Sequence, residues 1–188
     1  MISYASNFMG NFKLGDNIVF NLRILQYFYE LYSDGTSLQK RLLQKPITIL
    51  NVSITEAILQ DFYTRMRSFT REKIDVSISV LARVRGAQID DFSKYIANAR
   101  RNDFFDLKDT EFYDVLDDLR KLRNRVHIQN EKRYFEPDDS SAFSAERMVL
   151  SEKALETVIE TMQRKYSRDH AFIADFNLPW DSHLTEAA

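Results

Sequence analysis

The chain has 188 residues, of which 44% are hydrophobic and 29% charged, a composition typical of a globular protein able to bury a substantial core. Its net charge of −2 argues against a protein that coats nucleic acid non-specifically, although a local basic patch is compatible with it. The absence of cysteine excludes disulfide bonds, thiolate zinc sites and cysteine nucleophiles, and the four glycines and three prolines favour long helices over many tight turns.

Apolar residues recur at helical spacing through most of the chain. The segments that predict helices cover residues 16–33, 37–44, 46–69, 75–85, 89–102, 109–130 and 151–169. Asp16 is a suitable N-cap for the first helix, and Gly35 is expected to end it. Pro46 is expected to begin a new helix, because proline is tolerated in a first turn. Residues 75–85 also alternate like a strand, but no partner strand is evident.

These segments predict an all-α bundle of about five to seven helices in a single domain over residues 1–188. The two long helices over 46–69 and 109–130 have the strongest apolar stripes and are expected to form its centre. Residues 1–15 are predicted to be an N-terminal arm, and 136–146 a polar loop. Residues 172–188 are predicted to be a C-terminal arm, which docks through Trp180 on its own bundle or on a second copy.

No signal peptide is recognisable, and no apolar run approaches the roughly 20 residues that cross a bilayer. We therefore expect a cytoplasmic protein without a membrane partner. There is no glycine-rich phosphate loop, no G-x-S-x-G elbow and no HExxH or Glu-x-x-His pair. We expect neither a cofactor nor a metal ion.

The segment over residues 109–130 combines a buried stripe with a polar border. Asp109 or Thr110 is suited to cap it. The stripe comprises Phe112, Val115, Leu116, Leu119, Leu122 and Val126. An α-helix turns about 100° per residue, which places a compact set of polar side chains at the edge of the stripe and Arg125 on the opposite face. The set comprises Arg120, Arg123, Asn124 and His127.

The sequence LRKLRNRVHIQN within this segment resembles the signature of the HEPN superfamily, small all-α domains. The signature is an arginine, four to six residues and a histidine, often with a polar residue after the arginine. Arg120 and His127 meet the spacing, and Arg123-Asn124 meets the arginine–polar pattern. The resemblance implies a metal-independent ribonuclease of a toxin–antitoxin, phage-defence or RNA-decay system. It further implies a homodimer in which two His127 side chains face one cleft, and a possible antitoxin partner.

The chemistry of these residues is suited to RNA cleavage without metal, in which the 2′-hydroxyl attacks the adjacent phosphate. Histidine moves protons near neutral pH, and arginine donates paired hydrogen bonds to phosphate oxygens. His127 is therefore the predicted proton-transfer residue. Arg123, in i,i+4 contact with it, and Arg120 are the predicted phosphate-binding groups, and Asn124 is the predicted orienting group.

Other interpretations of this segment remain open. His127 is equally compatible with a boundary histidine bonded to a backbone carbonyl. In this segment the acidic residues lie near the N-terminal end and the basic residues near the C-terminal end, an arrangement that complements the helix dipole. Asp117 and Lys121 also form an i,i+4 pair. Glu56 is compatible with a partner of the cluster but more typical of a solvated helix face. The alternative functions are a non-catalytic nucleotide-binding, RNA-binding or dimerisation module, and an unrelated structural bundle.

The arginine–histidine spacing also occurs a second time. Arg164 and His170 satisfy it where the last predicted helix ends, and both are expected on the surface.

Overall fold

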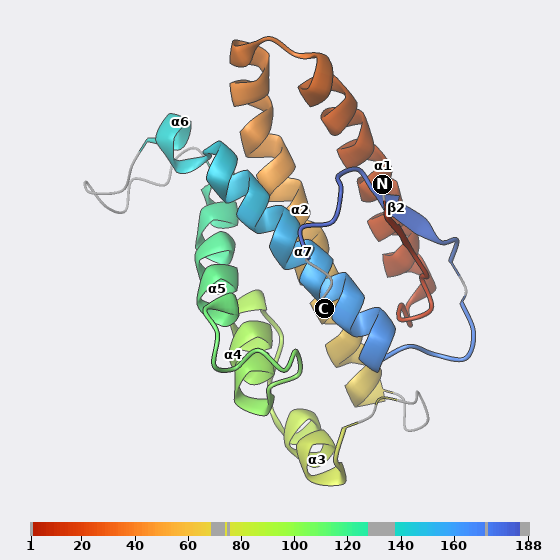
Figure 1. Ribbon diagram of the computed structural model, residues 1–188. Helices are drawn as coiled ribbons and strands as arrows, with labels where there is room; N and C mark the ends of the chain where they lie inside the picture. The colour runs from red at the N-terminus through yellow and green to blue at the C-terminus, as the bar shows by residue number, and fades with distance from the viewer. Residues whose placement is uncertain (1, 69–73, 75, 128–137, 172, 185–188) are drawn as a thin grey trace.

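The computed structural model describes residues 2–68, 74, 76–127, 138–171 and 173–184. Helices form a bundle with a short two-stranded ribbon at one side, which confirms the predicted all-α class (Figure 1). The elements are β1 (Ile2–Tyr4), α1 (Phe12–Asp34), α2 (Ser37–Ser68), α3 (Ile78–Gly86), α4 (Phe92–Asn102), α5 (Phe112–Arg123), the 3₁₀ turn η1 (Asn124–Val126), α6 (Asp139–Ala142), α7 (Ala145–Lys165) and β2 (Phe176–Leu178).

Helix α2 is the long central element. It packs against α1 and α7 and also contacts α3, α4 and α5. The prediction of a break before Pro46 is wrong, because the helix continues through this residue. A proline removes the bond to the carbonyl four residues earlier. Here that carbonyl belongs to Leu42, an exposed residue, so the proline lies in a part of the helix that faces solvent on one side.

The second helix of the centre is α7 rather than the predicted 109–130 segment. It begins at Ala145, where the Ser144 hydroxyl accepts a hydrogen bond from the Arg147 amide, instead of near Ser151. Its buried face includes Leu155 and Val158, which are fully covered by neighbouring elements. The earlier start occurs because the apolar pattern extends back beyond the predicted first turn to the buried Met148.

The N-terminal region is also more ordered than the predicted arm. Helix α1 begins at Phe12 with Asn11 as its N-cap, so Asp16 lies inside the helix rather than before it. Gly35 ends the helix as predicted. Gly15 lies within α1, and a Cβ atom there would fall 1.6 Å from the end of the Ile173 side chain. A larger residue at this position would therefore displace Ile173.

The C-terminal arm lies on its own bundle. Strand β2 pairs antiparallel with β1, and the Trp180 ring lies 5.3 Å from the Tyr29 ring of α1. The imidazole Nε2 of His183 lies 2.5 Å from the buried carboxylate of Glu152 in α7. The sequence predicts that this arm docks on its own bundle or on a second copy. In the structure, its described residues dock on their own bundle.

The middle of the chain follows the prediction more closely. The segment predicted as a helix over 75–85 is helical from Ile78, with Ser77 as the N-cap, and α3 continues to Gly86. Residue 75 lies outside the described residues. The predicted polar loop over 136–146 contains the short helix α6, and its first two residues also lie outside the described part.

A buried arginine joins three segments at one end of the bundle. Arg65 of α2 is 1% exposed and donates hydrogen bonds to the carbonyls of Phe8 and Tyr166. One turn earlier, the Asp61 carboxylate accepts hydrogen bonds from the amides of Gly10 and Asn11, both at 2.8 Å. These contacts fix the start of α1 and the end of α7 against α2.

Replacing Arg65 by methionine is expected to lower the free energy of unfolding by about 3–5 kcal/mol, because two carbonyls and the Asp61 carboxylate lose a buried cationic partner. Urea denaturation followed by circular dichroism measures the change. Arg164→Met, on the exposed end of α7, is the control and should change stability by no more than about 0.5 kcal/mol. A similar effect of both substitutions would contradict this role for Arg65.

Candidate functional site

Helix α5 carries the basic segment and packs through its apolar face. Leu116, Leu119 and Leu122 recur at helical spacing and are buried against α2, α4 and α7. Its N-cap is Glu111, which makes no side-chain capping hydrogen bond, so the prediction of Asp109 or Thr110 as the cap is wrong. The Phe112 amide donates a hydrogen bond to the Thr110 hydroxyl just before the helix. The basic side chains of the last turn therefore lie on a helix whose orientation is fixed by the core.

This helix ends earlier than the sequence predicts. It is α-helical to Arg123 and continues as the single turn η1, and His127 has an extended backbone with φ −80° and ψ 105°. Val126, the last residue of the predicted stripe, is 48% exposed, so no burial stabilises a further turn. His127 thus leaves the helical face on which its i,i+4 contact with Arg123 is predicted. Residues 128–130 lie outside the described part.

Arg123 is bound to a carboxylate from another helix. Its guanidinium forms an ion pair with Glu56 of α2, and the two side chains are 27% and 25% exposed. The Nε atom of Arg123 is buried without a hydrogen-bond partner, and burial lowers the pKa of this guanidinium. Glu56 is therefore an ion-pair partner of the cluster rather than a solvated helix-face residue, which the sequence favours.

Arg120 is held along its own helix. Its Nε atom donates a 2.8 Å hydrogen bond to Asp117, which also pairs with Lys121 at 2.9 Å, as the sequence predicts. Partial burial raises the pKa of Asp117, but the hydrogen bonds from Lys121 and Arg120 outweigh burial, and the net shift is downward. The Asp117 carboxylate is therefore ionised near neutral pH and compensates part of the charge of both cations.

Arg125 points toward α6 and is more buried than the other two arginines of the segment. Its side chain is 14% exposed, and its Nε atom lies 3.6 Å from the Asp139 carboxylate. Lys45 of α2 lies 2.5 Å from the same carboxylate. Lys45 and Asp139 are absent from the sequence-based cluster, because Asp139 lies in a stretch that reads as a polar loop.

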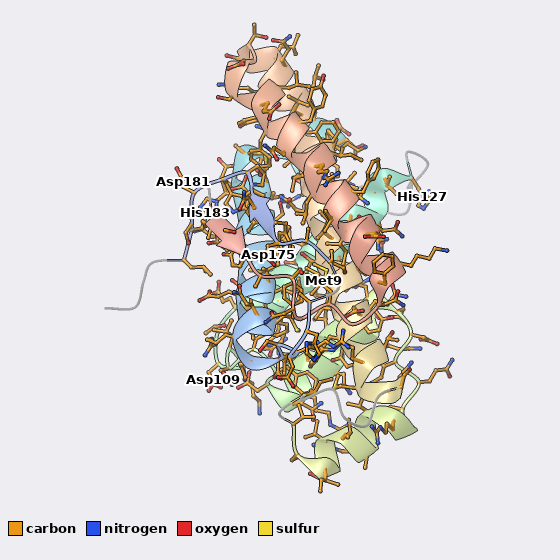
Figure 2. The ribbon with its side chains drawn as sticks, turned by 90° about the vertical axis from the view of Figure 1, so that its right-hand side faces the viewer. Met9, Asp109, His127, Asp175, Asp181 and His183 are labelled. Carbon is orange, nitrogen blue, oxygen red and sulfur yellow. The ribbon has the colours of Figure 1, made fainter. Side chains whose placement is uncertain are left out.

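Asn124 and His127 are exposed at the end of this region. Figure 2 shows His127 at the outer edge of the molecule, far from His183 on the C-terminal arm. Within the described residues, neither side chain makes a hydrogen bond, so no arginine is hydrogen-bonded to the imidazole. The arrangement offers an accessible imidazole beside cations that carboxylates hold in place.

The second occurrence of the arginine–histidine spacing is a surface feature. Arg164 and His170 are both exposed near the end of α7, as predicted. Among the described residues, no group of three or more His, Asp or Glu side chains is arranged to hold a metal ion. None of the helices in that part of the chain has the length and apolar character that crossing a bilayer requires.

Comparison of the chain with protein-family models, with curated proteins and with solved structures finds no match. The residues of the described site and their geometry are therefore the basis for inferring a function.

The Glu56–Arg123 ion pair is expected to couple α2 to α5 by about 1 kcal/mol or more, because both groups are largely shielded from water. A double-mutant cycle with Glu56→Gln and Arg123→Gln, followed by urea denaturation, measures this coupling. The control cycle uses Asp117→Asn and Arg120→Gln, an i,i+3 pair within one helix, with an expected coupling of about 0.3–0.5 kcal/mol. Equal coupling in the two cycles would show that the inter-helix pair has no special role.

Proposed function

We propose that this protein is a metal-independent endoribonuclease of the HEPN type, which cleaves RNA by attack of a 2′-hydroxyl on the adjacent phosphate. The observation that supports this most directly is the exposed imidazole of His127 just beyond a helix whose last turn carries three cations. Proton transfer near neutral pH and a fixed positive charge are the two requirements of this reaction.

The proposed roles follow from the chemistry of each side chain. His127 transfers the proton, and its exposed position allows a large substrate to reach it. Arg123 and Arg120 bind the phosphate and stabilise the charge that develops on it. A guanidinium has five N–H donors, so a carboxylate partner orients it and uses only part of its donors. Asn124 orients the imidazole or a ribose hydroxyl.

The proposal includes a homodimer. One imidazole cannot easily act as both general acid and general base in the same step, and a second copy would supply another His127 to a shared cleft. The position of His127 at the edge of the molecule is compatible with such an arrangement (Figure 2). An RNA-cleaving protein of this kind would act as a toxin or phage-defence effector in the cytoplasm, restrained by an antitoxin.

His127→Ala is expected to reduce RNA cleavage by about 100-fold or more, the loss typical of removing a general acid–base. Purified protein is incubated with RNA in excess chelator, and the products are analysed for 2′,3′-cyclic phosphate ends. His170→Ala is the matched control, since it removes an exposed histidine that also follows an arginine. Cleavage that survives in His127→Ala, or that depends on added metal, would refute the assignment.

A second candidate is a non-catalytic module that associates through its helices. The charges of Arg120 and Arg123 are already matched by carboxylates, which is also the arrangement of a purely structural contact. In addition, α1 and the start of α2 expose several large apolar side chains. They are Phe20, Tyr27, Leu31, Leu38 and Leu42. Exposed apolar residues of this number favour an interaction surface.

For this alternative, we expect sedimentation velocity to detect an oligomer. The double substitution Phe20→Glu/Leu42→Glu should convert it to a monomer, because charges placed in an apolar interface must be desolvated. RNA incubated with the protein would remain intact. A monomer at every concentration, with unchanged sedimentation in the variant, would exclude association through this face.

A further inference from the structure

Three exposed arginines lie on α2 and α3, in the region where α2 contacts α3 and α4. Figure 1 shows α3 at the end of the bundle away from α6. Arg67, in the last turn of α2, donates a 3.1 Å hydrogen bond to the Ala87 carbonyl just after α3. Arg85 of α3 donates a 3.0 Å hydrogen bond to the Met66 carbonyl of α2. Arg83 of α3 donates a 3.1 Å hydrogen bond to the Asn102 side-chain oxygen of α4. We call Arg67, Arg83 and Arg85 the arginine cluster.

Among the residues that the structure describes, no carboxylate is paired with this cluster. Within the described ranges, each of its guanidiniums bonds only a neutral carbonyl or amide oxygen. Arg100 in α4 is different, because the carboxylate of Asp114 accepts two hydrogen bonds from it at 2.6 and 2.9 Å. Each guanidinium of the cluster uses one of its five N–H donors, and the remaining donors are available to a ligand.

The existing hydrogen bonds also organise the cluster in advance. A long side chain that is already fixed loses less rotational freedom when it binds a ligand. Planar guanidiniums match the geometry of phosphate oxygens and donate two parallel hydrogen bonds. The cluster therefore has the charge, the donors and the rigidity of a phosphate-binding surface.

The positions of the arginines in α3 indicate a ligand with several phosphates. Arg83 and Arg85 are two residues apart, so they project about 200° apart around the helix, on either side of the buried Val84. A single phosphate cannot reach both flanks, and a flat anionic membrane would contact only one. A flexible chain of phosphates can cross α3 and contact both.

We propose that the arginine cluster binds the phosphate backbone of single-stranded RNA and forms an anchoring surface separate from His127. The choice of RNA as the polyanion rests on the proposed function, whereas the site itself rests on the geometry of the three arginines. Binding there is independent of base sequence, because phosphate contacts carry no sequence information.

The test measures binding of a fluorescent 2′-O-methyl RNA, which lacks the attacking hydroxyl, by anisotropy over a range of salt concentrations. Arg83→Gln/Arg85→Gln is expected to raise the Kd about tenfold or more and to reduce the magnitude of the salt slope by about 1.4, because two phosphate contacts to a single strand are lost. Arg83→Gln alone, whose partner is only the Asn102 side chain, tests the same site if the double variant unfolds.

The matched control is Lys94→Gln/Arg100→Gln, which removes two exposed cations that are paired with carboxylates. An unchanged Kd in this control supports the proposal. An equal loss in both double variants, or binding to anionic phospholipid vesicles in preference to RNA, would overturn it.

His127→Ala separates this inference from the proposed function. RNA binding through the cluster without cleavage would reject the nuclease and keep the anchoring surface. Cleavage lost in His127→Ala, with unaltered RNA binding by Arg83→Gln/Arg85→Gln, would reject the surface and keep the nuclease.

Discussion

The buried guanidinium of Arg65 is the contact on which one whole end of the bundle depends. It joins α2 to the carbonyl of Phe8, before α1, and to that of Tyr166, after α7. Removing a charge from water costs several kcal/mol, so it is stable there only with its polar partners in place. Gly10 is part of the same constraint, since a Cβ atom there would fall 2.6 Å from the Arg65 side chain. The segment before α1 therefore follows the position of this arginine.

The same helix also positions the candidate site. Glu56 of α2 pairs with Arg123 at the end of α5, and Lys45 of α2 pairs with Asp139 of α6. Because α2 is surrounded by other helices, it buries polar groups as well as apolar ones, and these groups set the orientation of their neighbours. The cations near His127 are thus fixed by long-range ion pairs rather than by their own helix alone.

The arginines of this protein occupy two different electrostatic environments. Arg120 and Arg123, near His127, are paired with carboxylates, which orients them and reduces their net field. Arg83 and Arg85, at the far end, bond neutral oxygens and are paired with no carboxylate among the described residues. A phosphate at the first group would compete with an existing ion pair, whereas at the second it would meet no such competition from the described residues. This difference separates the proposed chemistry from the proposed anchoring.

Local pattern determined much of this protein from sequence alone. Helical periodicity identifies the all-α class, the end of α1 at Gly35 and the Asp117–Lys121 pair, because each depends on residues within a few positions of one another. Only the tertiary structure decided that α5 stops at Arg123, since whether Val126 finds a surface to pack against depends on distant elements. It also decided that Arg123 faces a carboxylate, whereas Arg83 and Arg85 face neutral oxygens. The partners of these three arginines come from other helices, and no local spacing encodes the distance between them.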